Sequence, residues 1–418
     1  MSQLQTPGAS PGGGRCAPVD RLRAVLTVFV VLHHALVGYH AYAPPVTSDW
    51  STSMWWRAFP VVDTARMPGA DLIMSFNDSY FMALMFLLAG LYAWPALAAR
   101  GVGAFVRERA LRLGVPFIVS CVALAPIAYY PAWLQRGGQG GVAGYVHDWL
   151  ALPVWPAGPA WFLWVLLAFG ICAAIVHALI PGLRAKAAAF GEWCAARPFR
   201  AFLVLAVAGA VGYIPLERAF GGFSWFDLGP FNAQSSRVLM YAAYFAFGMA
   251  LGARGTPALF APDGALARRW GRWAALAFTA FFTMMAVVIA LFAAIEKGTL
   301  PLGLVLTADI AFCISGAATS FAAIGLVARR VRGGGPIGTS LERNAFGIYL
   351  LHYLFVSMLQ YQLLGVALPA VAKVVLVFGG ALALSWGTSA ALGRIPVVAR
   401  VIGQGPIRPS QPVPALVT

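Results

Sequence analysis

Of the 418 residues, 60% are hydrophobic and only 10% are charged, whereas about 25% of residues are charged in ordinary soluble domains. This composition excludes a typical soluble protein and indicates a chain that lies mostly in a lipid bilayer. The formal net charge of +15 would suit a nucleic-acid-binding protein, but the basic residues occur in short clusters between apolar runs, so nucleic acid is not an expected partner.

The first 18 residues are rich in Gly, Pro and Ser and are predicted to form a disordered cytoplasmic leader. Residues 19–396 are predicted to form one transmembrane domain without an internal repeat. Residues 397–418 follow as a cytoplasmic tail too short to fold alone.

Ten apolar segments recur along the chain, and each is close to the length that crosses about 30 Å of hydrocarbon as a helix. They are Ala24–Ala43, Ser79–Leu97, Leu113–Tyr130, Ala160–Ile180, Ala201–Leu216, Val238–Ala253, Trp273–Ile295, Leu302–Ala328, Asn344–Leu364 and Val366–Leu392. The predicted fold is therefore an all-α, polytopic transmembrane bundle of about ten helices.

Most of the 29 lysines and arginines fall in alternate loops when the N-terminus is placed in the cytoplasm. The positive-inside rule then predicts that both termini are cytoplasmic. Lys373 is among the few basic residues expected at the outer side.

Between the first two apolar segments, Pro44–Asp78 is predicted to be a long external loop without helix. It is rich in tryptophan and aspartate, and long loops in compact bundles are usually functional. Pro131–Pro159 is a second outer segment, and an aromatic belt at the membrane interface accounts for much of the tryptophan in both.

The first apolar segment contains His34 deep in its interior, and an ionisable residue at that depth is a candidate functional group. Arg23 precedes it by eleven residues, which is about three helical turns, so Arg23 and His34 share one face about 16 Å apart. His33 points about 100° away from that face. The alternative for either histidine is a hydrogen bond to a neighbouring helix.

Before the third apolar segment, Arg107, Arg109 and Arg112 lie within six residues, on the predicted cytoplasmic side. Guanidinium groups bind phosphate in a bidentate manner, and Arg109 and Arg112 share a helical face. The cluster is therefore a candidate site for phosphate groups. The alternative is contact with anionic lipid headgroups.

The five cysteines are far apart, and the six histidines form no pattern typical of a metal site. Neither a metal nor a permanently bound cofactor is expected.

Several motifs in one order resemble the acyltransferase-3 family of bacterial membrane acyltransferases, which includes O-antigen acetylases and glucan-modifying succinyl transferases. Arg23, ten residues and His34 look like its opening motif, and Arg109-x-x-Arg112 looks like its inner R-x-x-R motif. Three further stretches are similar to its other signatures: Phe81–Gly90, with Ala-Gly where Ser-Gly is more usual, Gly158–Leu163 and Gly347–His352.

The resemblance covers nearly the whole membrane region, and it implies an O-acyltransferase of the bacterial inner membrane. The implied donor is cytoplasmic acyl-coenzyme A, a co-substrate, and the implied acceptor is a carbohydrate or lipid-linked sugar. Two features depart from the family: Arg21 stands where Gly is common, and an esterase-like domain found in some relatives is not expected here.

Under this hypothesis His34 and Arg23 are the catalytic candidates, and Arg109, Arg112 and Arg107 bind the phosphates of coenzyme A. His34 would act as a general base on the acceptor hydroxyl or carry the acyl group briefly, and the sequence leaves both open. His352, Asp309 and Asp78 are candidates for the acceptor side, with an interhelical hydrogen bond or ion pair as the alternative.

Two other functions are open at this stage. A proton-coupled transporter or flippase would use buried His and Asp residues as a relay, although the chain shows no inverted repeat and few carboxylates inside its apolar segments. A non-catalytic subunit of an envelope assembly is the third.

Overall fold

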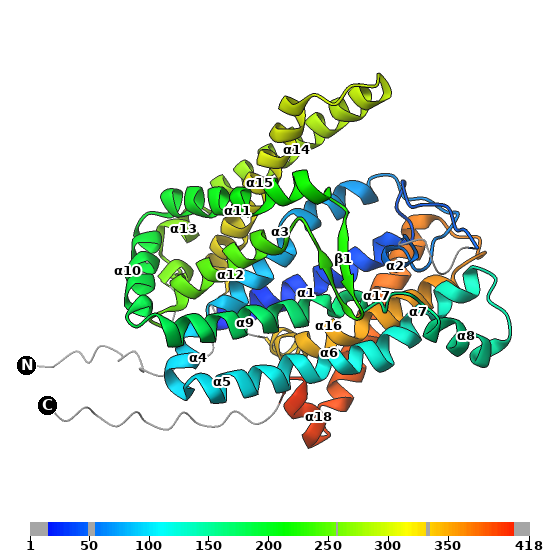
Figure 1. Ribbon diagram of the computed structural model, residues 1–418, viewed down its shortest axis with the longest axis horizontal. Helices are drawn as coiled ribbons and strands as arrows, with labels where there is room; N and C mark the ends of the chain where they lie inside the picture. The colour runs from blue at the N-terminus through cyan, green and yellow to red at the C-terminus, as the bar shows by residue number, and fades with distance from the viewer. Residues whose placement is uncertain (1–15, 49–54, 256–257, 332–334, 405–418) are drawn as a thin grey trace, which may run out of the picture.

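The computed structural model describes residues 16–48, 55–255, 258–331 and 335–404 (Figure 1). In chain order the elements are α1 (Ala17–Val37), α2 (Trp55–Ala58), α3 (Ala70–Gly90), α4 (Ala93–Arg100), α5 (Val102–Arg109), η1 (Ala110–Gly114), α6 (Val115–Val119), η2 (Ser120–Leu124), α7 (Ala125–Gln135), α8 (Gly141–Leu150), η3 (Gly158–Ala160), α9 (Trp161–Leu179), α10 (Leu183–Ala196), α11 (Pro198–Phe220), β1 (Trp225–Leu228), β2 (Phe231–Gln234), α12 (Val238–Gly252), η4 (Ala258–Phe260), α13 (Ala265–Arg268), α14 (Trp270–Glu296), α15 (Leu302–Arg330), α16 (Pro336–Gln362), α17 (Ala370–Leu392) and α18 (Pro396–Val401).

All ten predicted apolar segments lie mainly on helices, so the helical class is confirmed. In the described part of the chain, seven helical stretches are long and apolar enough to cross a membrane: Ala70–Arg100, Val102–Gln135, Gly158–Leu179, Pro198–Phe220, Trp270–Glu296, Leu302–Arg330 and Ala370–Leu392. Helix α12 is apolar but shorter. The protein is thus a multi-pass membrane protein, while the count of ten crossings and the side of each terminus stay predictions.

The leader predicted over residues 1–18 lies largely outside the described residues, which begin at residue 16, and α1 begins at Ala17. Of the tail, residues 405–418 also lie outside them.

Helix α15 is the most buried of these seven stretches, since 78% of its most apolar window is buried, against 17% for α14 beside it. Close contact between α3 and α12 depends on small residues. A Cβ atom on Gly248 or Gly252 would lie within about 2 Å of the Leu87 or Leu91 carbonyl oxygen. Such Gly-x-x-x-Gly spacing lets two helices approach at backbone distance where lipid provides no hydrophobic driving force.

The helix from Val102 to Gln135 contains two π-helical turns, η1 and η2. Each precedes a proline, Pro116 or Pro126, that lacks the N–H needed for a regular helical hydrogen bond. Widening the turn before each proline keeps the helix continuous. It places Arg112 in the first widened turn and Ser120 in the second.

The loop predicted over Pro44–Asp78 is shorter than expected, because α3 begins at Ala70 and carries both Asp71 and Asp78. Gly69 precedes α3 at φ +84°, and Asp71 in its first turn suits the positive end of the helix dipole. The prediction that this whole segment is non-helical was wrong.

A short antiparallel hairpin of β1 and β2 joins α11 to α12 and was not predicted. Its two-residue turn is Gly229-Pro230, with Gly229 at φ +59°, a combination that suits a tight hairpin. The hairpin lies near the middle of the bundle's length and is joined to α2 by the ion pair of Arg57 with Asp227; α2 and α8 lie toward one end, while α4 and α5 lie toward the other (Figure 1). These two ends are called the hairpin end and the arginine end below.

Candidate active site

Helix α1 presents its two adjacent histidines to different neighbours, as the helical spacing predicted. The ring of His33 stacks on Phe81 of α3, with centroids 5.3 Å apart. The ring of His34 instead meets His352 and Tyr353 of α16, with centroids 5.0 and 5.1 Å away. The structure thus brings together His34 and His352, which are 318 residues apart in the sequence.

The hydrogen bonds of this pair determine which nitrogens carry protons. Nδ1 of His352 lies 2.7 Å from the Tyr349 carbonyl oxygen, and a carbonyl can only accept, so this nitrogen donates. Nε2 of His352 is then an acceptor. It lies 3.2 Å from Nδ1 of His34, which also lies 2.8 Å from the Val30 carbonyl.

Nδ1 of His34 is therefore the protonated nitrogen, shared between these two acceptors. Nε2 of His34 is left with its lone pair, as a general base or a nucleophile requires. His352 is fully buried, and its hydrogen bond to the Tyr349 carbonyl fixes its ring. Its Nε2 therefore holds the imidazole of His34 in one tautomer and one orientation.

Gln360 of α16, two turns beyond His352, holds the end of α1 against α16. Its side-chain amide donates to the carbonyls of His34 and Ala35, which lie in the last turn of α1 and lack helical partners. A Cβ on Gly38 would lie 2.8 Å from the Val61 carbonyl oxygen and 3.0 Å from the Gln360 amide, so only glycine permits this approach. The last turn of α1 is thereby fixed beside the histidine pair.

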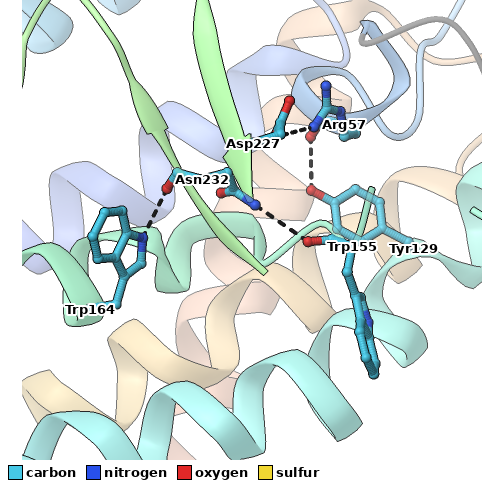
Figure 2. A network of polar contacts seen from close by, with 6 residues as sticks. All are labelled: Arg57, Tyr129, Trp155, Trp164, Asp227 and Asn232. Carbon is cyan, nitrogen blue, oxygen red and sulfur yellow. Dashed lines mark hydrogen bonds and ion pairs between the residues drawn. The ribbon is translucent and has the colours of Figure 1, made fainter. Parts of the chain in front are cut away.

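Tyr353 connects His34 to the hairpin end. Its hydroxyl lies within hydrogen-bond reach of the Tyr129 hydroxyl and the Arg57 carbonyl, at 3.4 and 3.3 Å. The Tyr129 hydroxyl also donates to the Arg57 carbonyl at 2.8 Å (Figure 2). The Arg57 guanidinium in turn pairs with Asp227 of β1 at 2.8 Å, so the hairpin is coupled to a ring that packs on His34.

The hairpin is also fastened to the start of α9. The Trp164 indole donates to the Asn232 carbonyl at 2.9 Å, and the Asn232 amide donates to the Trp155 carbonyl at 3.4 Å (Figure 2). The segment around Val62 is held as firmly, because the Gln135 amide bonds both its N–H and its carbonyl.

Two of the motifs that suggested a family meet at a small cleft of about 20 Å³. Gly158, Pro159 and Ala160 form one wall, and Tyr349 and Tyr353 form the facing wall. The Tyr349 hydroxyl donates to the Pro159 carbonyl and joins the two walls. Since Tyr353 also packs on His34, the cleft adjoins the histidine pair.

At the arginine end, Arg23, Arg100, Arg109 and Arg112 form one group, called the arginine cluster. The guanidinium of Arg109 is close enough to the other three to feel their repulsion, and it packs over the Phe105 ring at 5.1 Å. Glu108 pairs with Arg100 and with Arg112. No ion pair within the described residues joins Arg23 or Arg109 to a carboxylate.

Other predicted site residues lie elsewhere. Arg107 is exposed on α5, and no described contact joins it to the arginine cluster. Asp309 of α15 lies 3.8 Å from Arg218 and does not contact the histidine pair. Asp78 pairs with Arg237 at 2.6 Å, on the side of α1 that carries His33.

Three parts of this arrangement were missed from the sequence. Gln360 follows His352 at a spacing of eight, which keeps both on one helical face, so a search along that face would have found it. Arg237 and the buried pair of Lys373 with Asp63 have no local signal, because each partner is far away in the chain. In the part of the chain that the structure describes, no group of three or more His, Cys, Asp or Glu residues could hold a metal ion.

Comparison with known proteins places these observations in a family. The family model described as an acyltransferase domain matches residues 18–390, nearly the whole chain. No curated protein and no solved structure matches the chain. The matched range contains both histidines, the arginine cluster and the cleft, so this membrane protein belongs to the acyltransferase-3 family.

Proposed function

We propose that this protein is an O-acyltransferase of the bacterial inner membrane. It moves an acetyl- or succinyl-type group from cytoplasmic acyl-coenzyme A to a hydroxyl of a carbohydrate or lipid-linked sugar. The observation that carries the proposal is the His34–His352 pair, in which Nε2 of His34 keeps its lone pair. Acyl-coenzyme A is a co-substrate, and no permanently bound cofactor takes part.

The arginine cluster supports the donor half of the proposal. Coenzyme A carries its phosphates at one end and its thioester at the far end of a long, thin arm. Guanidiniums without carboxylate partners bind phosphate strongly, and among the described residues Arg23 and Arg109 have no such partner. With the phosphates there, the arm would extend along α1, and His34 lies eleven residues or about 16 Å from Arg23.

In the proposed reaction, Nε2 of His34 accepts the proton of the acceptor hydroxyl while that oxygen attacks the thioester carbonyl. The new C–O bond forms and the C–S bond breaks. The departing thiolate of coenzyme A takes the proton from His34, which returns to its neutral state. While the imidazole is charged, its Nδ1–H is stabilised by the Val30 carbonyl and by Nε2 of His352.

In this scheme His352 is a positioning residue, and Asp78 is an acceptor-side candidate. Asp309 keeps that role only as a prediction from the sequence, since its contacts are with Arg218.

The test is transfer of radiolabelled acetyl and succinyl groups from coenzyme A thioesters into envelope glycans, in membranes with equal amounts of each variant. His34→Ala should abolish transfer. His147→Ala is the control, because it removes an imidazole that is 84% exposed on α8, and it should retain catalysis. Transfer that survives His34→Ala would remove His34 from the mechanism.

A second arm separates general-base catalysis from an acyl-histidine intermediate. Protein incubated with labelled acyl-coenzyme A and no acceptor should remain unlabelled under the general-base scheme. Hydroxylamine-labile label that is present on the native protein and absent from His34→Ala would show acyl transfer through His34 instead, since acylated cysteine would keep its label in that variant. If no thioester gives any transfer with the native chain, the transporter hypothesis takes precedence.

A further inference from the structure

A buried ion pair lies on the side of α1 that carries His33. Arg237, just before α12, is only 5% exposed, and its Nη2 lies 2.6 Å from Oδ2 of Asp78. Its Nη1 also donates to the Asp78 carbonyl at 3.2 Å, and its guanidinium lies 5.0 Å from the centroid of the Phe312 ring. The orientation of both charged groups is therefore fixed.

This site retains unused hydrogen-bonding capacity. Within the described residues, the buried Nε of Arg237 and Nδ1 of His33 have no hydrogen-bond partner. The Asp78 side chain is 39% exposed although its partner is buried. Because buried polar atoms in native proteins are nearly always satisfied, these atoms indicate a place for a polar ligand.

Aromatic rings continue from the ion pair to the hairpin. Tyr241 of α12 is within electrostatic range of Arg237, and its ring stacks on Trp161 of α9 with centroids 5.8 Å apart. The edge of Trp161 meets Trp225 of β1, also at 5.8 Å. Both tryptophans are partly exposed.

A planar guanidinium–carboxylate pair beside aromatic faces matches the chemistry of a sugar ring. Vicinal hydroxyls both donate and accept hydrogen bonds. The Arg237 guanidinium can donate to them, and the Asp78 carboxylate can accept from them. The C–H faces of a pyranose are apolar and pack on aromatic rings. Since the charge of Arg237 is already balanced by Asp78, an anionic sugar would gain little.

We infer that Asp78, Arg237, Trp161 and Trp225 form a subsite for a neutral pyranose of the acceptor, with the buried Tyr241 ring supporting Trp161 from behind. The inference rests on the proposed function for its position in the reaction. The subsite adjoins the His33 side of α1, and the rings of His33 and His34 are 5.5 Å apart. A sugar bound there would present a hydroxyl near the histidine pair.

The experiment measures glycoside binding without any acyl donor. Saturation-transfer difference NMR is recorded on the full chain in lipid nanodiscs, with methyl glucopyranoside, methyl galactopyranoside and methyl glucuronide as probes. Both neutral glycosides should bind, and the glucuronide should bind less well. Trp225→Ala and Arg237→Lys should each weaken neutral-glycoside binding about tenfold or more. Leu228→Ala is the matched control, since Leu228 lies on the same strand with a side chain 73% exposed, and it should bind as the native chain does.

Native-like binding by folded Trp225→Ala protein would overturn the subsite, as would tighter binding of the glucuronide than of the neutral glycosides. Thermal unfolding identifies any variant that fails to fold, and Trp225→Ala, outside the helices, decides the case if Arg237→Lys does fail. A native chain that binds glycosides through Trp225 but transfers no acyl group would reject the proposed function and retain the subsite.

Discussion

The two ends of the bundle differ in how their charged side chains are paired. At the hairpin end two ion pairs join segments that are distant in the sequence: Lys373 with Asp63, and Arg57 with Asp227. At the arginine end, the guanidiniums of Arg23 and Arg109 lie near other arginines and have no described carboxylate partner.

Paired charges fix polypeptide, whereas unpaired cations are available to a ligand. Under the proposed function, the comparison predicts that the first end stabilises the fold and that the second end binds an anion. The predictions below test that difference, from the largest expected effect to the smallest.

Breaking the pair of Lys373 and Asp63 should destabilise the protein most. Their side chains are 2% and 3% exposed, with Nζ 2.6 Å from Oδ2. Lys373→Met leaves a buried carboxylate without its partner, which should cost about 3–5 kcal/mol in the free energy of unfolding. Thermal unfolding in detergent measures the loss.

The double variant Asp63→Leu/Lys373→Met is the control for that experiment. Removing both charges should recover much of the stability, because a buried ion pair is worth little more than a well-packed apolar pair. A double variant as unstable as Lys373→Met alone would show that the pair itself stabilises the fold.

Neutralising the arginine cluster should weaken donor binding while the fold remains stable. Arg109→Gln and Arg112→Gln should each raise the KM for acyl-coenzyme A about tenfold, since a charge-assisted phosphate contact is worth about 1.5–3 kcal/mol. The KM of the native protein for acyl-coenzyme A should also rise with salt concentration, because salt screens the exposed arginines of the cluster.

Arg107→Gln is the matched control for the cluster, as it removes an exposed arginine from the same helix. Its KM should equal that of the native protein. Equal effects of all three substitutions would indicate a diffuse interaction with anionic lipid rather than a phosphate site.

Separating Arg57 from Asp227 should have a smaller effect, since both side chains are nearly one-fifth exposed. Arg57→Gln or Asp227→Asn should cost about 1 kcal/mol, and a double-mutant cycle isolates the pair. Hydrogen exchange should rise in the hairpin and in the segment around Val62. Unchanged exchange there would show that the remaining hydrogen bonds hold the hairpin end without this pair.

The smallest effect concerns Asp148 of α8, outside the membrane-spanning helices. Hydrogen bonds from the Trp133 indole, at 2.8 Å, and from His147 hold the pKa of this carboxyl below its usual value. Because the pKa of Asp148 is lower in the native state than in the unfolded chain, the ionised carboxylate stabilises the native state at pH values above the pKa of the unfolded chain. This stabilisation is lost as the pH falls through the pKa of the native state. Asp148→Asn should flatten that acid dependence of hydrogen exchange in α8. A variant with the native pH profile would contradict this assignment.

Much of the fold followed from local chemistry. Apolar segments of membrane-spanning length became helices because backbone polar groups in lipid must bond within their own segment. The different directions of His33 and His34 followed from the helical repeat, and α1 presents them to α3 and α16. The motifs also indicated the family, which the match over residues 18–390 confirms.

Only the tertiary structure determined which distant residues meet. His34 and His352 lie on two helices that are far apart in the sequence. The tautomer of His34 depends on a carbonyl from each helix, that of Val30 on α1 and that of Tyr349 on α16. The ion pairs of Asp78 with Arg237 and of Asp63 with Lys373 also form only through helix packing, because the sequence shows four charged residues but not which of them are partners. Helix formation depends on neighbours in the chain, so the sequence alone determined most of the apolar helices, although not where α3 begins. Pairing of buried polar groups depends on helix packing, which brings together residues hundreds of positions apart.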